Sequence, residues 1–317
     1  MVPPSLVSRS TGPGKSRGLV ARIRRRLRVG GKLRTLRHKF GLEPIRTTTY
    51  LGHPFAYPAD SFIGQQIARG GAWDPILRTV ATALLPSDAP TICEVGSNIG
   101  ASVLQIVAAK PHAEIYAFEP SNRFQPLLAR NLAAAGAKPV HIRSILLGRA
   151  SGQGWLSNNT TSASMVSAEY DGHDPRGRQL AEMATLDDAM AGVRSVEMIK
   201  VDTDGYDFEV LRGAEGILRR QRPLLFFELA VRMLEAPEDE LRWLRSLGYR
   251  RLACFRPSPQ TFIGLTSDPV QAIRWAGANG TYCDVLVGAE QSPPAIRLVG
   301  LDLTLPEWNP GTVGVGR

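Results

Sequence analysis

The sequence predicts an α/β protein built on a mostly parallel β-sheet with helices on both faces. From about residue 90, short apolar runs rich in β-branched and aromatic residues alternate with segments of helical periodicity, which is typical of a parallel sheet covered on both sides. Glycines directly follow the first of these runs, and acidic residues end several of the others. A chain of 317 residues can hold one such domain with extensions.

Seven strands are expected, each a short run of β-formers bounded by polar or turn residues. Residues 224–229 are apolar almost throughout, as expected of a strand buried on both faces. In chain order the expected strands are 91–95, 114–118, 140–144, 196–201, 224–229, 249–254 and 282–287.

Four helices are expected between these strands, where apolar residues recur with a period near 3.6. They cover residues 99–109, 123–135, 208–219 and 238–247. The segment between the last two strands shows no clear helical pattern, so we expect part of this end of the sheet to be antiparallel.

Four segments are expected along the chain: a basic tail (1–46), a helical lead-in (47–90), the α/β domain (91–290) and a C-terminal extension (291–317). The tail carries a net charge of +12, whereas the rest of the chain carries −3. A slightly acidic body argues against specific nucleic-acid binding. Residues 19–40 place leucines among arginines at roughly helical spacing, so the tail could contact an anionic membrane, or be a solvated basic tail.

The expected compartment is the cytoplasm, with peripheral membrane contact through the tail. No apolar run approaches the ~18–20 residues that span a bilayer, and no apolar segment of a secretory signal follows the basic N-terminus. The cysteines Cys93, Cys254 and Cys283 lie in apolar runs without a C-x-x-C spacing. This pattern indicates buried thiols rather than a disulfide scaffold or a zinc site.

A nucleotide-like site is predicted after the first strand, where residues 94–100 read Glu-Val-Gly-Ser-Asn-Ile-Gly. Glycines let the backbone approach a ligand closely, and the helix that follows presents free N–H groups. Glu119 ends the second strand 23 residues after Gly96, where an acid commonly receives ribose hydroxyls.

Two ligand classes fit this pattern. A nicotinamide dinucleotide is disfavoured, because the spacing is G-x-x-x-G and Asn98 stands where the middle glycine would admit a pyrophosphate. Glu94 would repel phosphates but suits an ammonium group. A ribose joined to a cationic amino acid, as in S-adenosyl-methionine, satisfies both acids.

A second group of acids ends the fourth and fifth strands. Asp202 and Glu228 each lie at the end of an apolar strand, at the sheet edge where ligands bind in such folds. Asp204-Gly205 reads as a turn, and Asp207 reads as a helix cap or first-turn acid.

These motifs together resemble the FkbM family of S-adenosyl-methionine-dependent methyltransferases. The resemblance covers residues 57–287 by the order of its motifs, and it departs from the family at four places: Glu94 for Asp, Ser97 for Ala, Asp204 for Glu, and Tyr206 for a small residue. The motifs are Glu94–Gly100, Phe118–Pro120, Leu186–Asp188, Ile199–Gly205, Glu209–Ala214 and Phe227–Glu228.

The resemblance implies a class I methyltransferase fold, with a seven-stranded sheet whose last strand is antiparallel. It implies methyl transfer to a hydroxyl of a sugar, glycan or small natural product. The implied cofactor-binding residues are Glu94, Gly96, Asn98, Gly100 and Glu119. Asp202 would lie near the methyl group and the acceptor.

A hydroxyl is a poor nucleophile, so a general base is expected, and Asp202 and Glu228 are the candidates. His141 and His173 are rivals that are better explained as a strand residue and a surface residue. A divalent cation held by Asp202, Asp204 and Glu228 is a disfavoured alternative. Two alternatives for the whole chain are a non-catalytic binding module and a nicotinamide oxidoreductase. Residues 151–167 are expected to form a loop near the acceptor.

Overall fold

The computed structural model describes residues 44–158, 163–167, 178–257, 260–278, 280 and 282–292. The chain divides after Pro44, and the unit that begins at Ile45 is the one described here. The amphipathic stretch 19–40 of the predicted basic tail lies outside the described residues. So does the C-terminal extension from residue 293 onward.

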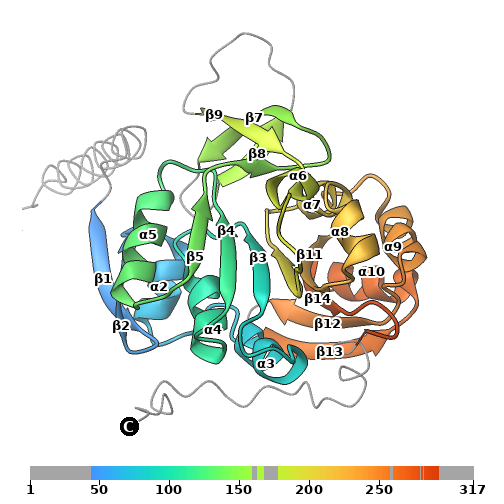
Figure 1. Cartoon of the computed structure of the whole chain (residues 1–317), viewed down its shortest axis with the longest axis horizontal. Helices are drawn as coiled ribbons and strands as arrows, with labels where there is room; N and C mark the ends of the chain where they lie inside the picture. Colours follow the sequence, from blue (N-terminus) through green and yellow to red (C-terminus); the bar gives the residue numbers. More distant parts are fainter. Residues whose placement is uncertain are drawn as a thin grey trace, which may run out of the picture. The chain divides into compact units, whose positions relative to one another are not determined.

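An eight-stranded sheet forms the centre of this unit (Figure 1). Its spatial order is β13-β12-β14-β11-β10-β3-β4-β5. The five strands from β5 to β11 are parallel to one another, and β14 is antiparallel to both of its neighbours. The strands are β3 (Thr91–Val95), β4 (Glu114–Phe118), β5 (Val140–Arg143), β10 (Met198–Val201), β11 (Leu224–Ala230), β12 (Leu252–Pro257), β13 (Gln260–Thr266) and β14 (Tyr282–Val287). The expected class I methyltransferase arrangement, with its antiparallel last strand, is confirmed.

The end of the sheet departs from the prediction in two ways. β13 is an eighth strand, paired antiparallel with β12. The segment before β14 contains a helix that was not expected, α10 (Pro269–Ala278). The backbone N–H of Val270 donates to Asp268 Oδ1 in its first turn, so an acid satisfies a free donor at the start of this helix.

Two hydrophobic cores lie on opposite faces of the sheet, as continuous apolar strands require. In β11 the side chains alternate, with Leu224 and Phe226 in one core and Leu225 and Phe227 in the other. The first core packs against α2 (Phe62–Ala68), α3 (Ile76–Leu84), α4 (Ala101–Ala109) and α5 (Gln125–Ala134). The second packs against α6 (Leu186–Ala189), α7 (Asp207–Arg212), α8 (Glu215–Arg220), α9 (Pro237–Ser246) and α10.

The single helix expected over residues 208–219 is in fact two short helices, α7 and α8. The break lies at Gly213, where a Cβ would sit 2.0 Å from the carbonyl oxygen of Gly148. The carbonyl of Gly213 accepts a hydrogen bond from the Asp187 N–H. The Asp187 carboxylate in turn accepts from the N–H groups of Gly216 and Ile217 at 2.7 Å each, so it caps the start of α8.

The lead-in over residues 47–90 contains the expected helices, α2 and α3, but a β-hairpin that was not expected precedes them. It begins with a β-hairpin of β1 (Ile45–Tyr50) and β2 (His53–Pro58). Leu51 and Gly52 form the two-residue turn, both with positive φ, as tight hairpin turns require. Three threonines precede Tyr50, and their branched Cβ atoms favour a strand and disfavour a helix because they restrict χ1.

The loop expected over residues 151–167 is wrong, because this segment supplies two strands of a second, four-stranded sheet. That sheet has the order β6-β9-β7-β8 and lies beyond the ends of β3 and β4 in Figure 1. Its strands are β6 (Leu146–Leu147), β7 (Gly152–Asn158), β8 (Ala163–Ser167) and β9 (Arg178–Ala184). Trp155 and Leu156 are buried in it, although the small polar residues around them favour a loop.

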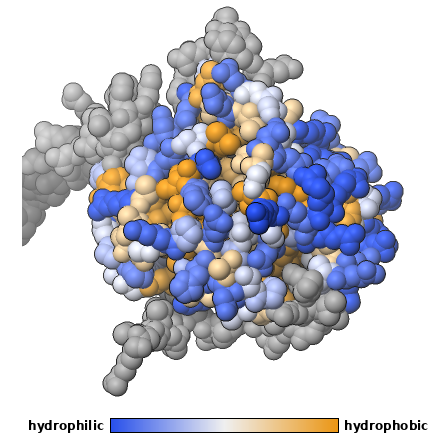
Figure 2. All heavy atoms as spheres, viewed as in Figure 1, coloured by the Kyte–Doolittle hydropathy of each residue, from blue (hydrophilic) through white to orange (hydrophobic). Residues whose placement is uncertain are grey.

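The outer surface over α8 and α9 is mostly hydrophilic (Figure 2), with ion pairs such as Arg219–Glu215 and Arg242–Glu238 along the helices. Among the described residues, no helix combines the length and apolar character needed to cross a membrane.

Candidate active site

A cleft opens at the carboxyl end of β3. This is the point where the chain switches sides, because β4 and β5 add to one side of β3 and β10 and β11 to the other, and ligands bind at such switch points. The cleft encloses about 520 Å³, including its open mouth. Its walls are Val95, Gly96, Asn98, Phe118, Glu119, Pro120, Ile145, Leu146, Leu147, Asp202, Thr203, Asp204 and Tyr206. Four predicted site residues therefore meet here: Gly96, Asn98, Glu119 and Asp202.

The turn after β3 requires glycine at its first position. Gly96 has φ of +81°, and a Cβ on it would lie 1.9 Å from the backbone oxygen of Asp202. Asn98 also adopts a left-handed conformation, and its Oδ1 accepts a hydrogen bond from the Ile99 N–H at 2.9 Å. The turn thus brings backbone, rather than side chains, to the floor of the cleft.

Gly100 precedes α4 with φ of +89°, and it is not among the residues that line the cleft. A Cβ there would lie 2.9 Å from Leu128 Cδ1. Gly100 therefore allows α4 to pack closely on α5, and its predicted contact with a cofactor stays a prediction.

Glu119 is held in place by two backbone donors. The Asn98 N–H donates to Oε2 and the Ser121 N–H to Oε1, both at 2.8 Å. The side chain is buried. Burial raises the pKa of Glu119 to about 7, although the two hydrogen bonds oppose this shift. Each carboxylate oxygen keeps a lone pair for a further donor from the cleft.

Glu94 is not among the residues that line the cleft, and its carboxylate pairs with a lysine of the neighbouring strand. Lys200 Nζ lies 2.9 Å from Glu94 Oε1, and Ser102 Oγ donates to the same oxygen at 2.6 Å. The side chains of Glu94 and Lys200 are 0% and 1% exposed. The charge of Glu94 therefore has a partner within the protein, and its predicted contact with a cofactor stays a prediction.

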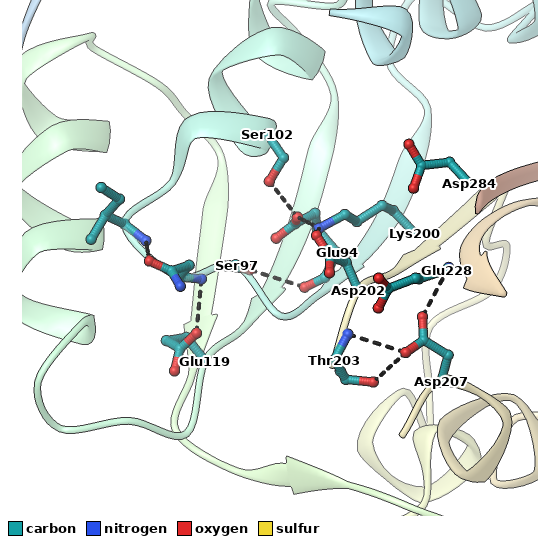
Figure 3. Close-up of polar contacts among 12 residues, drawn as sticks. Glu94, Ser97, Ser102, Glu119, Lys200, Asp202, Thr203, Asp207, Glu228 and Asp284 are labelled. Carbon is teal, nitrogen blue, oxygen red and sulfur yellow. Dashed lines mark hydrogen bonds and ion pairs between the residues drawn. The ribbon is translucent and has the colours of Figure 1, made fainter. Parts of the chain in front are cut away.

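Lys200 was not singled out from the sequence, although strand periodicity provides a signal for it. Glu94 and Lys200 are direct partners in the register of β3 and β10. Asp202 follows two residues later on the same face, and Lys200 Nζ lies 3.3 Å from Asp202 Oδ2. Figure 3 shows these three side chains meeting, with Glu228 and Asp284 close by.

Glu228 and Asp284 are likewise direct partners, in the antiparallel register of β11 and β14. Burial and the charges of Asp202, Asp207 and Asp284 raise the pKa of Glu228 to about 10. Burial is also the main cause that raises the pKa of Asp284 to about 7. Asp74, which precedes α3, has its pKa raised by burial and by Asp202 and Asp284, while Lys200 opposes the shift.

Gln260 connects the unexpected strand β13 to this group of acids. Its Nε2 donates to Asp284 Oδ2, and its Oε1 accepts from the Ile76 N–H at the start of α3, both at 2.9 Å. Asp74, Gln260 and Asp284 lie far apart in the chain, so only the folded structure identifies them as neighbours.

Asp207 has the predicted structural role at the start of α7. Its Oδ2 accepts from the N–H and the hydroxyl of Thr203, and its Oδ1 accepts from the Glu228 N–H. These three bonds join the loop after β10 to β11. Asp204 and Gly205 both have positive φ, which confirms the predicted turn.

His141 is not among the residues that line the cleft. His141 lies on β5, where its Nε2 is 3.1 Å from Glu114 Oε1 and its ring stacks on Tyr116, as expected of a structural residue. His173 lies outside the described residues. Within the described part of the chain, no group of three or more His, Cys, Asp or Glu side chains is arranged to hold a metal ion.

Comparisons with known proteins agree with this geometry. Residues 94–251, about half of the chain, match the family model described as a methyltransferase FkbM domain. A curated relative, methyltransferase sdnD of Sordaria araneosa, is 28% identical over 165 residues, which are 42% of this chain and 63% of that protein. The chain thus spans less than two thirds of this relative.

Two solved structures are similar at low identity. Methyltransferase FkbM from Methylobacillus flagellatus shares 14% identity with a TM-score of 0.43, over 65% of this chain and 47% of that one. M. jannaschii TYW2, solved in complex with AdoMet, shares 11% identity with a TM-score of 0.41, over 78% of this chain and 85% of that one.

The matched residues begin at Glu94, the buried acid one residue before the end of β3, and extend through the loops that form the cleft. The chain belongs to the FkbM methyltransferase family.

Proposed function

We propose that this chain is an S-adenosyl-methionine-dependent methyltransferase that acts on a hydroxyl of a sugar, a glycan or a small natural product. The observation that carries the proposal is Glu119, a buried carboxylate at the switch-point cleft whose oxygens are fixed by the Asn98 and Ser121 N–H groups. A carboxylate held in this way can accept hydrogen bonds from two ribose hydroxyls.

The rest of the cleft suits the same cofactor. The turn at Gly96 brings the backbone close to a ligand. Phe118, Ile145 and Leu146 supply apolar surface for a purine ring. The lining also carries the acids Asp202 and Asp204, which suit an ammonium or sulfonium group better than phosphates.

Bound S-adenosyl-methionine supplies an electrophilic methyl group. The chain must then hold an acceptor oxygen in line and remove its proton. Asp202 lines the cleft beside the Lys200 ammonium, so we assign it the role of general base. Glu228, with a pKa of about 10, holds a proton near neutral pH and can donate a hydrogen bond there.

Calorimetric titration with S-adenosyl-methionine tests the cofactor, using the Glu119→Ala variant. We expect binding by the wild-type protein and its loss in this variant. Glu238→Gln, which removes an exposed carboxylate on α9, is the control and should bind as the wild type does. Equal binding by all three proteins contradicts the site, and tight NADH binding without S-adenosyl-methionine binding supports the oxidoreductase.

Product analysis tests the reaction. Mass spectrometry of glycans and lipids from cells with and without the gene should show methylated species that depend on the gene. An Asp202→Asn variant that binds the cofactor should not restore them. Restoration by that variant favours the non-catalytic binding module.

The basic tail is proposed to bring the enzyme to an anionic membrane, where each basic residue near the surface contributes ~1 kcal/mol. The described fold begins with β1 at Ile45, so residues 45–317 form the matched truncation. In liposome sedimentation, the full chain should partition to anionic vesicles more strongly than this truncation. Equal partitioning contradicts the proposal.

A further inference from the structure

A continuous line of contacts leads from α4 through the sheet to the floor of the cleft. Ser102 Oγ donates to Glu94 Oε1, which pairs with Lys200 Nζ at 2.9 Å, and the same ammonium lies 3.3 Å from Asp202 Oδ2 (Figure 3). Asp202 is the member of this line that lines the cleft. Lys200 therefore connects a wholly buried acid to the candidate base.

Lys200 is charged despite its burial. A buried ammonium is costly unless carboxylates surround it. Burial lowers the pKa of Lys200, but the negative charges of Asp202, Glu94 and Asp74 outweigh this effect and raise it above its ordinary value. Eight acids and one tyrosine act on one another or on Lys200 in this region: Glu94 from β3, Glu119 after β4, Asp202 and Asp204 after β10, Asp207 from α7, Glu228 from β11, Tyr282 and Asp284 from β14, and Asp74 before α3.

Glu228 shows what happens in this region to an acid without such a partner. Within the described residues no ion pair is formed by Glu228, and its neighbours Asp202, Asp207 and Asp284 are all acids. Its pKa is raised to about 10, so it takes up a proton. Asp202 acts on the same acids, but its Oδ2 has the Lys200 ammonium at 3.3 Å.

We propose that Lys200 is a positioning residue that holds the Asp202 carboxylate ionised and fixed at the cleft. The inference rests on the proposed function, because an ionised Asp202 gives the cleft a negative charge that favours a sulfonium cofactor and can accept a proton from a hydroxyl. A purely structural role for Lys200, limited to neutralising Glu94, predicts different behaviour.

A double-mutant cycle separates these two roles. The proteins are the wild type, Lys200→Met, Asp202→Asn and the double variant. The quantity measured is the ratio of calorimetric affinities for S-adenosyl-methionine and S-adenosyl-homocysteine, which lacks the sulfonium charge. In Lys200→Met we expect this ratio to fall about tenfold at pH 7, since Asp202 takes up a proton, and to recover as the pH rises.

Adding Asp202→Asn to Lys200→Met should lower the ratio no further than Asp202→Asn does alone. Lys200→Arg, which keeps the charge, should stay within about threefold of the wild type. The proposal is overturned if Lys200→Met has its full effect in the Asp202→Asn background, or if it lowers stability while leaving the ratio and its pH dependence unchanged.

Infrared spectroscopy gives a readout that needs no cofactor. Glu94 loses its ammonium both in Lys200→Met and in the double variant with Asp202→Asn, so only Asp202 differs between these two proteins. At pH 7, Lys200→Met should show more protonated-carboxyl absorption than the double variant, and equal absorption overturns the proposal even where the wild type binds neither ligand. If Lys200→Met fails to fold because Glu94 is left unpaired, Glu94→Gln combined with Lys200→Met removes both charges and serves for the same measurements.

Discussion

Gly96 and the carbonyl oxygen of Asp202 are in such close contact that a Cβ on Gly96 would lie 1.9 Å from that oxygen. The first residue follows β3 and the second follows β10, and the Asp202 N–H donates to the Val95 carbonyl at 3.0 Å. The turn after β3 and the candidate base are thus fixed to each other through the backbone. A change at Gly96 must therefore move Asp202.

Gly96→Ala should lower the free energy of unfolding by about 3 kcal/mol and abolish measurable cofactor binding, because it combines left-handed strain with a backbone clash. Gly136→Ala is the matched control. Gly136 has φ of +65° and open space around its Cβ position, so strain alone should cost about 1 kcal/mol there. Denaturant unfolding and calorimetry measure both effects, and equal losses in the two variants contradict the clash.

Glu119 should make cofactor affinity depend on pH. Its folded pKa is about 7, above the ordinary value of 4.5, and ribose hydroxyls bind the ionised form. Affinity for S-adenosyl-methionine should therefore fall below about pH 7, approaching tenfold per pH unit. Glu119→Gln should bind about 10- to 100-fold more weakly and lose this dependence. Calorimetry from pH 5.5 to 8.5 checks both, and an unchanged slope in the variant contradicts the assignment.

The raised pKa of Glu119 affects stability in the opposite direction from cofactor affinity: a higher pH should favour cofactor binding but lower the free energy of unfolding. Because the folded state holds the proton more tightly than the unfolded state does, the contribution of Glu119 is present below pH 4.5 and is lost as the pH rises through about 7. Glu119→Gln should lose less stability between pH 5 and 8 than the wild type. Unfolding midpoints across this range measure the difference, and parallel curves contradict the shift.

The order of the seven expected strands of the main sheet and the turn after β3 were predictable from sequence because they depend on local patterns. β3, β4 and β14 coincide with the expected ranges, since apolar β-formers next to glycine or acid give a strong signal. The second sheet was missed because small polar residues surround its buried Trp155. The grouping of Asp74 and Asp284 around Lys200 was missed because it depends on register across distant strands.

Replacing Glu228 and Asp202 by their neutral amides should have different effects on turnover. Glu228 is protonated near neutral pH, with a pKa of about 10. Glu228→Gln therefore replaces one neutral group by another and should change turnover less than about threefold. Asp202→Asn removes the base and should lower turnover by about 100-fold or more. Turnover on the acceptor found by product analysis, at pH 7.5, distinguishes them. A larger loss in Glu228→Gln than in Asp202→Asn reverses the assignment.

Asn131 should be more important for stability than its place in a helix suggests. Its side chain is buried and makes three bonds: Oδ1 accepts from the Ala56 N–H at 2.7 Å, and Nδ2 donates to the carbonyls of Ala56 and Ile99 at 2.9 and 2.8 Å. Asn131→Ala leaves these three backbone groups unpaired and should cost about 2–4 kcal/mol. Because Ile99 follows Asn98 in the turn proposed to bind the cofactor, affinity for S-adenosyl-methionine should fall as well. Arg130→Ala, at the exposed neighbouring position, is the control for helix propensity. Denaturant unfolding and calorimetry compare the two variants. A similar small loss of stability in both would show that the Asn131 hydrogen bonds, which join α5 to β2 and to the turn after β3, contribute little to the free energy of unfolding.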